Sequence, residues 1–162
     1  MSEEVVESVA KSTSGNGSNA LMGEFTHALD PKRRLTIPRE WRRAMGDPDF
    51  VYVMRDRNGK CLDLLPKAEM ESLLQKLRQK ALFDPALTKA AMVIGANSEQ
   101  LMLDVQGRIR ISDKLLQFAN LTTTVVMAGS VRMAKLWNEA DYAAEVSTDL
   151  ADLNAALDAL EG

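Results

Sequence analysis

The sequence contains one cysteine, one histidine and no long apolar run, and each of these shortages excludes a class of protein. Cys61 has no second cysteine with which to form an internal disulfide, which suits a reducing cytoplasm. A catalytic pair of cysteine and histidine would need Cys61 and His27, and a zinc site would lack ligands. No apolar run reaches the roughly 18 residues of a membrane span, and no basic-then-apolar leader opens the chain. We therefore expect a cytoplasmic protein that neither spans a membrane nor is secreted.

The sequence also lacks the glycine-rich loops that hold phosphates in nucleotide-dependent enzymes. Neither a Walker loop nor a Gly-x-Gly-x-x-Gly motif occurs. We therefore expect no enzymatic activity, no cofactor, no metal and no small-molecule substrate. The 162 residues, 46% of them hydrophobic and 27% charged, are enough for one compact domain or two small halves.

What the chain does have is an internal repeat. Residues 30–38 read Asp-Pro-Lys-Arg-Arg-Leu-Thr-Ile-Pro, and residues 104–112 read Asp-Val-Gln-Gly-Arg-Ile-Arg-Ile-Ser. In both segments an aspartate is followed four residues later by an arginine, then by an alternating strand and a helix-start residue. The flanking apolar segments also correspond, with one small difference in loop length, so the chain is an internal duplication.

The apolar periodicity predicts the same elements in both copies: strand, strand, short helix, strand, strand. The first two strands of the first copy should form a hairpin with the basic triplet at its tip or just past it. Its short helix should have Pro38 as the first helical residue and stop at Gly46, and in the second copy Ser112 should be the N-cap. The four strands of the first copy are expected at residues 25–29, 35–37, 50–54 and 62–65.

Two helices should link the copies, one over residues 66–82 and one from the N-cap Asp84 to Gly95. The first 20 residues are rich in Ser, Gly, Asn and Glu and are expected to be a disordered extension. From Val146 to Leu160 apolar residues recur at steps of three and four, which predicts a helix that packs on its own domain or on a neighbouring subunit. The expected boundaries are 1–20 for the extension, 21–95 for the first repeat with the linking helices, 96–145 for the second repeat, and 146–162 for the acidic C-terminal helix. The residues expected to face inward from the first linking helix are Met70, Leu73, Leu74 and Leu77.

Charge is distributed unevenly along the chain, whose formal net charge is −3. Residues 30–46 contain six basic and two acidic side chains, whereas the equivalent residues 104–120 contain three basic and two acidic ones. From Glu139 onward there are acidic residues and no basic ones. The first copy is therefore predicted to carry the one strong basic patch. Its members are Lys32, Arg33, Arg34, Arg39, Arg42 and Arg43.

The aspartate and arginine of each repeated motif allow two interpretations. Asp30 could pair with Arg34 and hold the turn, as Asp104 could with Arg108. Alternatively, Arg34 and the two cations before it could contact phosphates or guanine edges. Both interpretations stay open for Arg34, whereas the structural one is favoured for Arg108 because the second copy is only weakly basic. The three arginines of the first short helix could equally form a solvated face, a subunit contact or a DNA contact.

The lead-in Met-Gly-Glu-Phe-Thr-His-Ala-Leu-Asp at residues 22–30, followed by Lys32, Arg34, Pro38 and a second Asp-x-x-Gly-Arg motif, resembles the MraZ family of bacterial transcriptional regulators. The resemblance covers roughly residues 21–145. It implies an α+β fold of tandem pseudo-symmetric AbrB-like halves, each part of a swapped-hairpin β-barrel, with linking helices. It further implies a nucleoid-associated homo-oligomeric ring that binds double-stranded DNA at short direct repeats upstream of the cell-division and cell-wall gene cluster.

Two positions depart from the pattern of that family. Arg33 stands where the family has glycine, and Ser112 stands where it usually has a second proline. A glycine suggests a turn with positive φ, which an arginine adopts at a cost of about 1 kcal/mol. We therefore expect the first loop to be shaped differently. Arg33 and the acidic tail leave an alternative function open, that of an oligomeric scaffold that has lost DNA binding.

Overall fold

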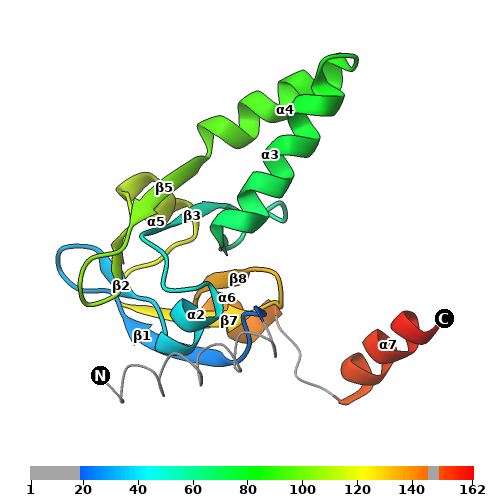
Figure 1. The fold of residues 1–162 in the computed structure, drawn as a ribbon. Coiled ribbons are helices and arrows are strands. Elements are labelled where there is room, and N and C mark those ends of the chain that lie inside the picture. The colour runs from blue at the N-terminus through cyan, green and yellow to red at the C-terminus, as the bar shows by residue number, and fades with distance from the viewer. Residues whose placement is uncertain (1–18, 146–149) are drawn as a thin grey trace, which may run out of the picture.

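The computed structural model describes residues 19–145 and 150–162, which form α-helices and antiparallel β-sheets (Figure 1). The first copy forms β1 (Glu24–Ala28), β2 (Arg34–Thr36), α2 (Arg39–Ala44), β3 (Phe50–Arg55) and β4 (Leu62–Leu65). The second copy forms β5 (Ser98–Met102), β6 (Arg108–Arg110), α5 (Asp113–Phe118), β7 (Thr124–Gly129) and β8 (Ala134–Asn138). The remaining helices are α3 (Lys67–Ala81), α4 (Pro85–Ala96), α6 (Glu139–Glu145) and α7 (Leu150–Glu161). The predicted order of elements is confirmed in both copies, while most of the predicted N-terminal extension lies outside the described residues.

The helix boundaries follow local capping chemistry. Ser112 caps α5 by accepting the backbone N–H of Leu115, as predicted, and Asp84 caps α4 by accepting that of Ala86. In the first copy Pro38 is the N-cap of α2 rather than its first helical residue, because the helix begins at Arg39. Gly46 ends this helix in a left-handed conformation, with φ of 80°.

The two copies exchange strands with one another. The six-stranded sheet has the order β1-β7-β8-β4-β3-β5, and β2 pairs with β6 in a separate two-stranded sheet. Replacing each strand by its counterpart in the other copy gives the same order read backwards, so the described chain has pseudo-two-fold topology. The predicted hairpin of β1 with β2 is wrong, since β1 pairs with β7 and β2 with β6. Pairing between copies is favoured because it places Leu35 opposite Ile109, both fully buried in the shared core.

The mixed α+β class is confirmed, but the sheets of the described residues do not close into a barrel. In the six-stranded sheet β1 and β5 are both edge strands, each paired on one side only. The core is nevertheless common to the two copies, and equivalent positions of both copies are at most 1% exposed in it. Neither copy can bury this face alone, and each such large side chain contributes about 1.5–3 kcal/mol when buried. The equivalent pairs are Leu35 and Ile109, Ile37 and Ile111, and Trp41 and Leu115.

The central pair of the six-stranded sheet, β4 and β8, joins the two copies. Here the equivalent residues Asp63 and Lys135 face one another across the strands. The Lys135 ammonium also bonds Asp56, with Nζ 2.7 Å from a carboxylate oxygen of each aspartate. Burial raises the pKa of Asp63 to about 7, and its hydrogen bond with Asp56 adds to that effect. The duplicated position has therefore diverged into an ion pair between a buried aspartate and a half-buried lysine.

The two linking helices are confirmed and form a hairpin that projects from the sheets (Figure 1). Of the four residues predicted to face inward from α3, Met70 is buried and the leucines are half-buried. No helix of the described residues is both long enough and apolar enough to cross a membrane. The last helix, α7, confirms a helix within the predicted acidic tail, although Val146 lies outside the described residues.

Candidate nucleic-acid interface

The two Asp-x-x-x-Arg motifs fold into the same turn. In the first, the Asp30 carbonyl accepts the Arg33 N–H at 2.9 Å, and the Asp30 N–H donates to the Arg34 carbonyl at 3.1 Å. The equivalent bonds of the second turn, from Gly107 to Asp104 and from Asp104 to the Arg108 carbonyl, are both 2.9 Å. The two turns therefore share one hydrogen-bond pattern.

The first turn tolerates an arginine where the second has a glycine. Arg33 has φ of 64° and Gly107 has φ of 78°, so both occupy the left-handed region. The expectation of a differently shaped first loop is therefore wrong. The carbonyl of Arg33 accepts the N–H of Ile111 at 3.0 Å, and the carbonyl of Gly107 accepts that of Ile37 at 2.9 Å. These bonds between the copies fix the backbone against the preference of the side chain.

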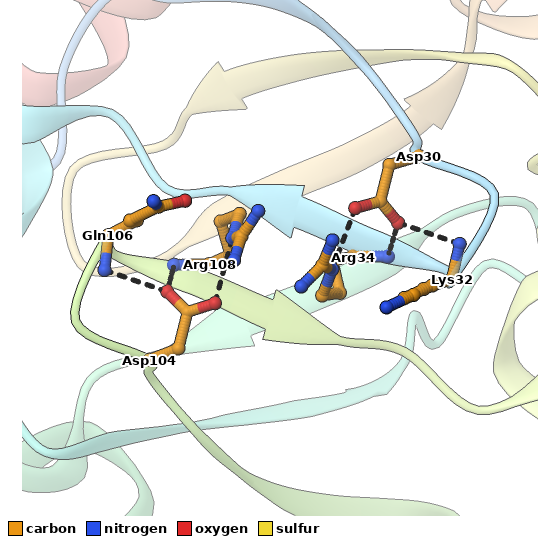
Figure 2. Close-up of polar contacts among 6 residues, drawn as sticks. All are labelled: Asp30, Lys32, Arg34, Asp104, Gln106 and Arg108. Atoms are coloured by element: carbon orange, nitrogen blue, oxygen red, sulfur yellow. Dashed lines mark hydrogen bonds and ion pairs between the residues drawn. The ribbon is translucent and has the colours of Figure 1, made fainter.

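Each turn is held by its aspartate (Figure 2). The Asp30 carboxylate accepts the backbone N–H of Lys32 at 2.9 Å and that of Arg34 at 2.8 Å, while Arg34 Nε donates to its other oxygen at 2.7 Å. Asp104 accepts the equivalent bonds from Gln106 and Arg108. The backbone N–H of the arginine is the largest favourable contact that lowers the pKa of each aspartate, and the guanidinium adds to it.

The ion pairs leave much of each arginine available. They use only Nε, and no described residue accepts a hydrogen bond from the terminal nitrogens of Arg34 or Arg108. The two side chains are 30% and 26% exposed, respectively. Holding the turn and binding an anion are therefore compatible roles for the same side chain.

Pairing of β2 with β6 brings arginines of both copies onto one surface. Arg34 lies opposite Arg110, and Thr36 lies opposite Arg108, while the intervening Leu35 and its partner face the core. Side chains opposite one another or two residues apart share a face of a ribbon. The outer face of this ribbon therefore carries three arginines. Figure 2 shows two of them, Arg34 and Arg108, with one turn at each end of the ribbon. We refer to this surface, made by Arg34, Thr36, Arg108 and Arg110, as the arginine ribbon.

Arg110 is not among the residues predicted for the basic patch, because charge counted along the chain treats the two copies as separate surfaces. The signal was present in the alternation Arg108-Ile109-Arg110, which places two cations on the same side of a strand. The strand partner, however, depends on contacts between the copies. Arg110 is exposed, whereas the ion-paired Arg108 is half-buried.

The other predicted cations occupy different surroundings. Lys32 is exposed at the tip of the first turn, and Arg33 is exposed and forms an ion pair with Asp113 at the start of α5. Arg39 and Arg43 are exposed on α2. The structure thus brings the cations of the first turn beside those of β6, while the helix arginines belong to a separate element.

Arg42 is tied to the second turn. Its Nε donates to the Ile37 carbonyl at 3.1 Å, and its guanidinium lies over Gly107. A Cβ at Gly107 would lie only 2.5 Å from that guanidinium, so a side chain there would require the Arg42 side chain to move. Arg42 therefore packs against the turn of the other copy, and Arg33 in the first turn contacts α5.

One buried cluster has the residue types of a metal site. Potential ligand atoms of Asp56, Cys61 and Asp63 lie within 4.8 Å of one another. The Lys135 ammonium already bonds both carboxylates, and burial raises the pKa of the Cys61 thiol to about 12, which disfavours the thiolate that binds metals. The donor set fits a lysine-bridged carboxylate pair better than a metal centre.

Comparison with known proteins relates most of the chain to one group. Residues 92–159 match the family model described as "MraZ protein, putative antitoxin-like". A protein named Transcriptional regulator MraZ from Corynebacterium jeikeium is 33% identical over 80% of this chain and 91% of the relative. Relatives of the same name from Symbiobacterium thermophilum and Thiobacillus denitrificans are each 33% identical, over 82% and 86% of this chain and 93% and 96% of their own.

Proposed function

Because this chain belongs to the MraZ family of transcriptional regulators, we propose that it binds double-stranded DNA in a sequence-specific manner through the arginine ribbon. The observation that carries the proposal is the placement of three arginines from two copies on one outward face. Arg34 and Arg110 are direct cross-strand neighbours, and like charges in that relation repel one another. A bound phosphate would relieve this repulsion, and the major groove of B-DNA has the width of a two-stranded ribbon.

The predicted site residues take different roles in this proposal. Lys32 and Arg33 at the turn tip contact phosphates, and Arg39 and Arg43 extend the basic surface along the flanking helix. Arg42 positions the turn at Gly107. The free terminal nitrogens of the ribbon arginines can form the bidentate contact with guanine, which is worth roughly 1–3 kcal/mol against a wrong base.

The proposed assembly is a homo-oligomeric ring of AbrB-like halves, with residues 21–95 and 96–145 as the two repeats. One small ribbon binds weakly, whereas several ribbons held rigidly gain orders of magnitude in affinity when DNA repeats match their spacing. The proposed targets are short direct repeats upstream of the cell-division and cell-wall gene cluster, bound in the cytoplasm at the nucleoid. The competing function is that of an oligomeric scaffold. Such a scaffold would still assemble, but it would show no salt-dependent binding to DNA.

Titration of upstream DNA at several salt concentrations tests this proposal. Replacement of Lys32 and Arg33 by alanine should weaken binding and lower the log–log salt slope by roughly 0.9 for each lost phosphate contact. The matched control is Arg57→Ala, which removes an exposed cation from the loop between β3 and β4. An oligomer with no salt-dependent affinity for this DNA, or equal effects of Arg57→Ala and the double substitution, would overturn the proposal in favour of the scaffold.

A further inference from the structure

The C-terminal helix α7 has an apolar stripe that nothing in the described chain covers. Residues 151–162 are all exposed, among them Leu153, Leu157 and Leu160, the last at 83%. Figure 1 shows the helix standing apart from the sheets and from the hairpin of α3 and α4. A helix of 12 residues is marginal in water by itself, so its stripe calls for a partner.

Further uncovered apolar side chains lie on the hairpin, at its tip and along α4. The inner residues of α4 face α3, while Met92 and Val93 point outward and are exposed. Leu82 and Phe83 at the tip are 79% and 89% exposed. Four large apolar side chains exposed on one projecting hairpin mark an interaction site. We refer to this surface, made by Leu82, Phe83, Met92 and Val93, as the hairpin patch.

The charges around the two surfaces are opposite. Residues 76–89, which include the tip of the hairpin, contain four cations and one acidic residue, Asp84. Helix α7 carries Asp152, Asp158 and Glu161 and has no basic residue. No ion pair within the described residues engages any of these cations or the three acids of α7. The four cations are Lys76, Arg78, Lys80 and Lys89.

A groove elsewhere on the molecule has the wrong sign for α7. It lies between the end of α2 and the start of α3, and its lining includes Asp47, Asp49, Glu69 and Glu71. An acidic helix would be repelled there, whereas the hairpin patch offers both apolar contact and attraction.

We propose that α7 of one copy packs along the outer face of α4 in a second copy of this chain. The leucine stripe covers the hairpin patch, and the acidic residues of α7 lie beside the cations of the hairpin. The leucine stripe and the hairpin patch are different surfaces, so each copy places its α7 on one neighbour and binds the α7 of another neighbour on its own hairpin patch. Such a heterologous contact generates a ring when the rotation between copies closes. The inference rests on the proposed assembly and identifies the contact that builds it.

Cysteine cross-linking tests the contact directly. Leu157→Cys is introduced in one batch of full-length chain and Val93→Cys in a second batch that carries a tag, and the two are mixed and oxidised. Cys61 does not interfere, since it is buried and its raised pKa keeps the thiol protonated. We expect a mixed cross-linked product. The control pair replaces Val93→Cys by Val105→Cys, a fully exposed position on the second turn, and should give none.

Two further measurements distinguish the possible failures. Leu157→Glu should reduce the mass in light scattering and leave the protomer folded, because α7 lies outside the core. Val93→Glu should cause the same loss of mass. An oligomer that persists in both variants, or an internal disulfide in a single chain carrying both cysteines, would overturn this inference while leaving the proposed assembly in place. A wild-type monomer would overturn the proposed assembly itself.

Discussion

Replacing Arg33 by glycine should stabilise the fold, although it removes an ion pair. Arg33 is held at φ of 64°, a conformation that costs a side-chain-bearing residue about 1–2 kcal/mol and a glycine almost nothing. The ion pair lost with Asp113 is exposed on both sides, at 46% and 62%, and such pairs are worth about 0–1 kcal/mol. The net expectation is a stabilisation of roughly 0–2 kcal/mol, from the difference of these two effects.

Comparison with Arg33→Ala isolates the backbone contribution. Alanine also loses the ion pair with Asp113, but it keeps the strained φ, so it should destabilise the fold by up to about 1 kcal/mol. The two variants should therefore differ by about 1–2 kcal/mol, whatever the ion pair contributes. Urea denaturation at a fixed protomer concentration measures this difference, because assembly makes the apparent stability depend on concentration.

The second turn supplies the matched control. Gly107→Ala imposes the same φ and also places a Cβ 2.5 Å from the Arg42 guanidinium, so it should destabilise more than Arg33→Ala does. Arg42→Ala combined with Gly107→Ala should remove the clash and retain the strain. If Arg33→Gly were less stable than Arg33→Ala, the left-handed backbone would not be the source of the cost and the reasoning would be refuted.

Two further predictions concern stability. The pKa of Asp63 is raised to about 7 from an ordinary 3.8, so its contribution to stability is complete below about pH 3.8 and is lost progressively as the pH rises to about 7. Asp63→Asn should remove this loss between about pH 4 and pH 7, and an equal pH dependence of the melting temperature in the two proteins would exclude it. Ser112→Ala should cost about 1 kcal/mol in urea denaturation, because it removes the α5 cap and the hydrogen bond that the Ser112 hydroxyl donates to Glu99. The control Ser130→Ala, in the loop before β8, should cost less, and equal costs would show that the two contacts of Ser112 contribute nothing special.

The sequence was sufficient to predict the helices and strands, but it was not sufficient to predict which strands pair with one another. Ser112 and Asp84 could be identified as caps because capping depends on a few neighbouring residues. The choice of strand partner could not be predicted, since the two copies have the same apolar pattern and Leu35 would suit either. Only burial across the whole molecule decides that it lies opposite Ile109.

The same distinction applies to the candidate site. The family resemblance indicated that Arg33 stands at a position that favours glycine. The hydrogen bond from the Ile111 N–H to the Arg33 carbonyl nevertheless holds the left-handed turn. Counting charges along the chain indicated a patch in the first copy alone. It could not show that Arg110 lies opposite Arg34, because that relation exists only once the copies have exchanged strands.

The most direct test of the arginine ribbon is the ratio of specific to non-specific DNA affinity for Arg110→Lys, measured beside Arg34→Lys. Lysine keeps the charge but lacks the planar fork required for a bidentate contact with guanine. Arg110 forms no ion pair with a described residue, so its replacement should leave the melting temperature nearly unchanged. If the arginine ribbon reads bases, each substitution should weaken binding to the specific repeats by roughly 1–3 kcal/mol relative to binding to non-specific DNA. If Arg110→Lys left the ratio of specific to non-specific affinity unchanged, a DNA-binding surface that reads bases with arginines of both copies would be contradicted, whatever the effect of Arg34→Lys.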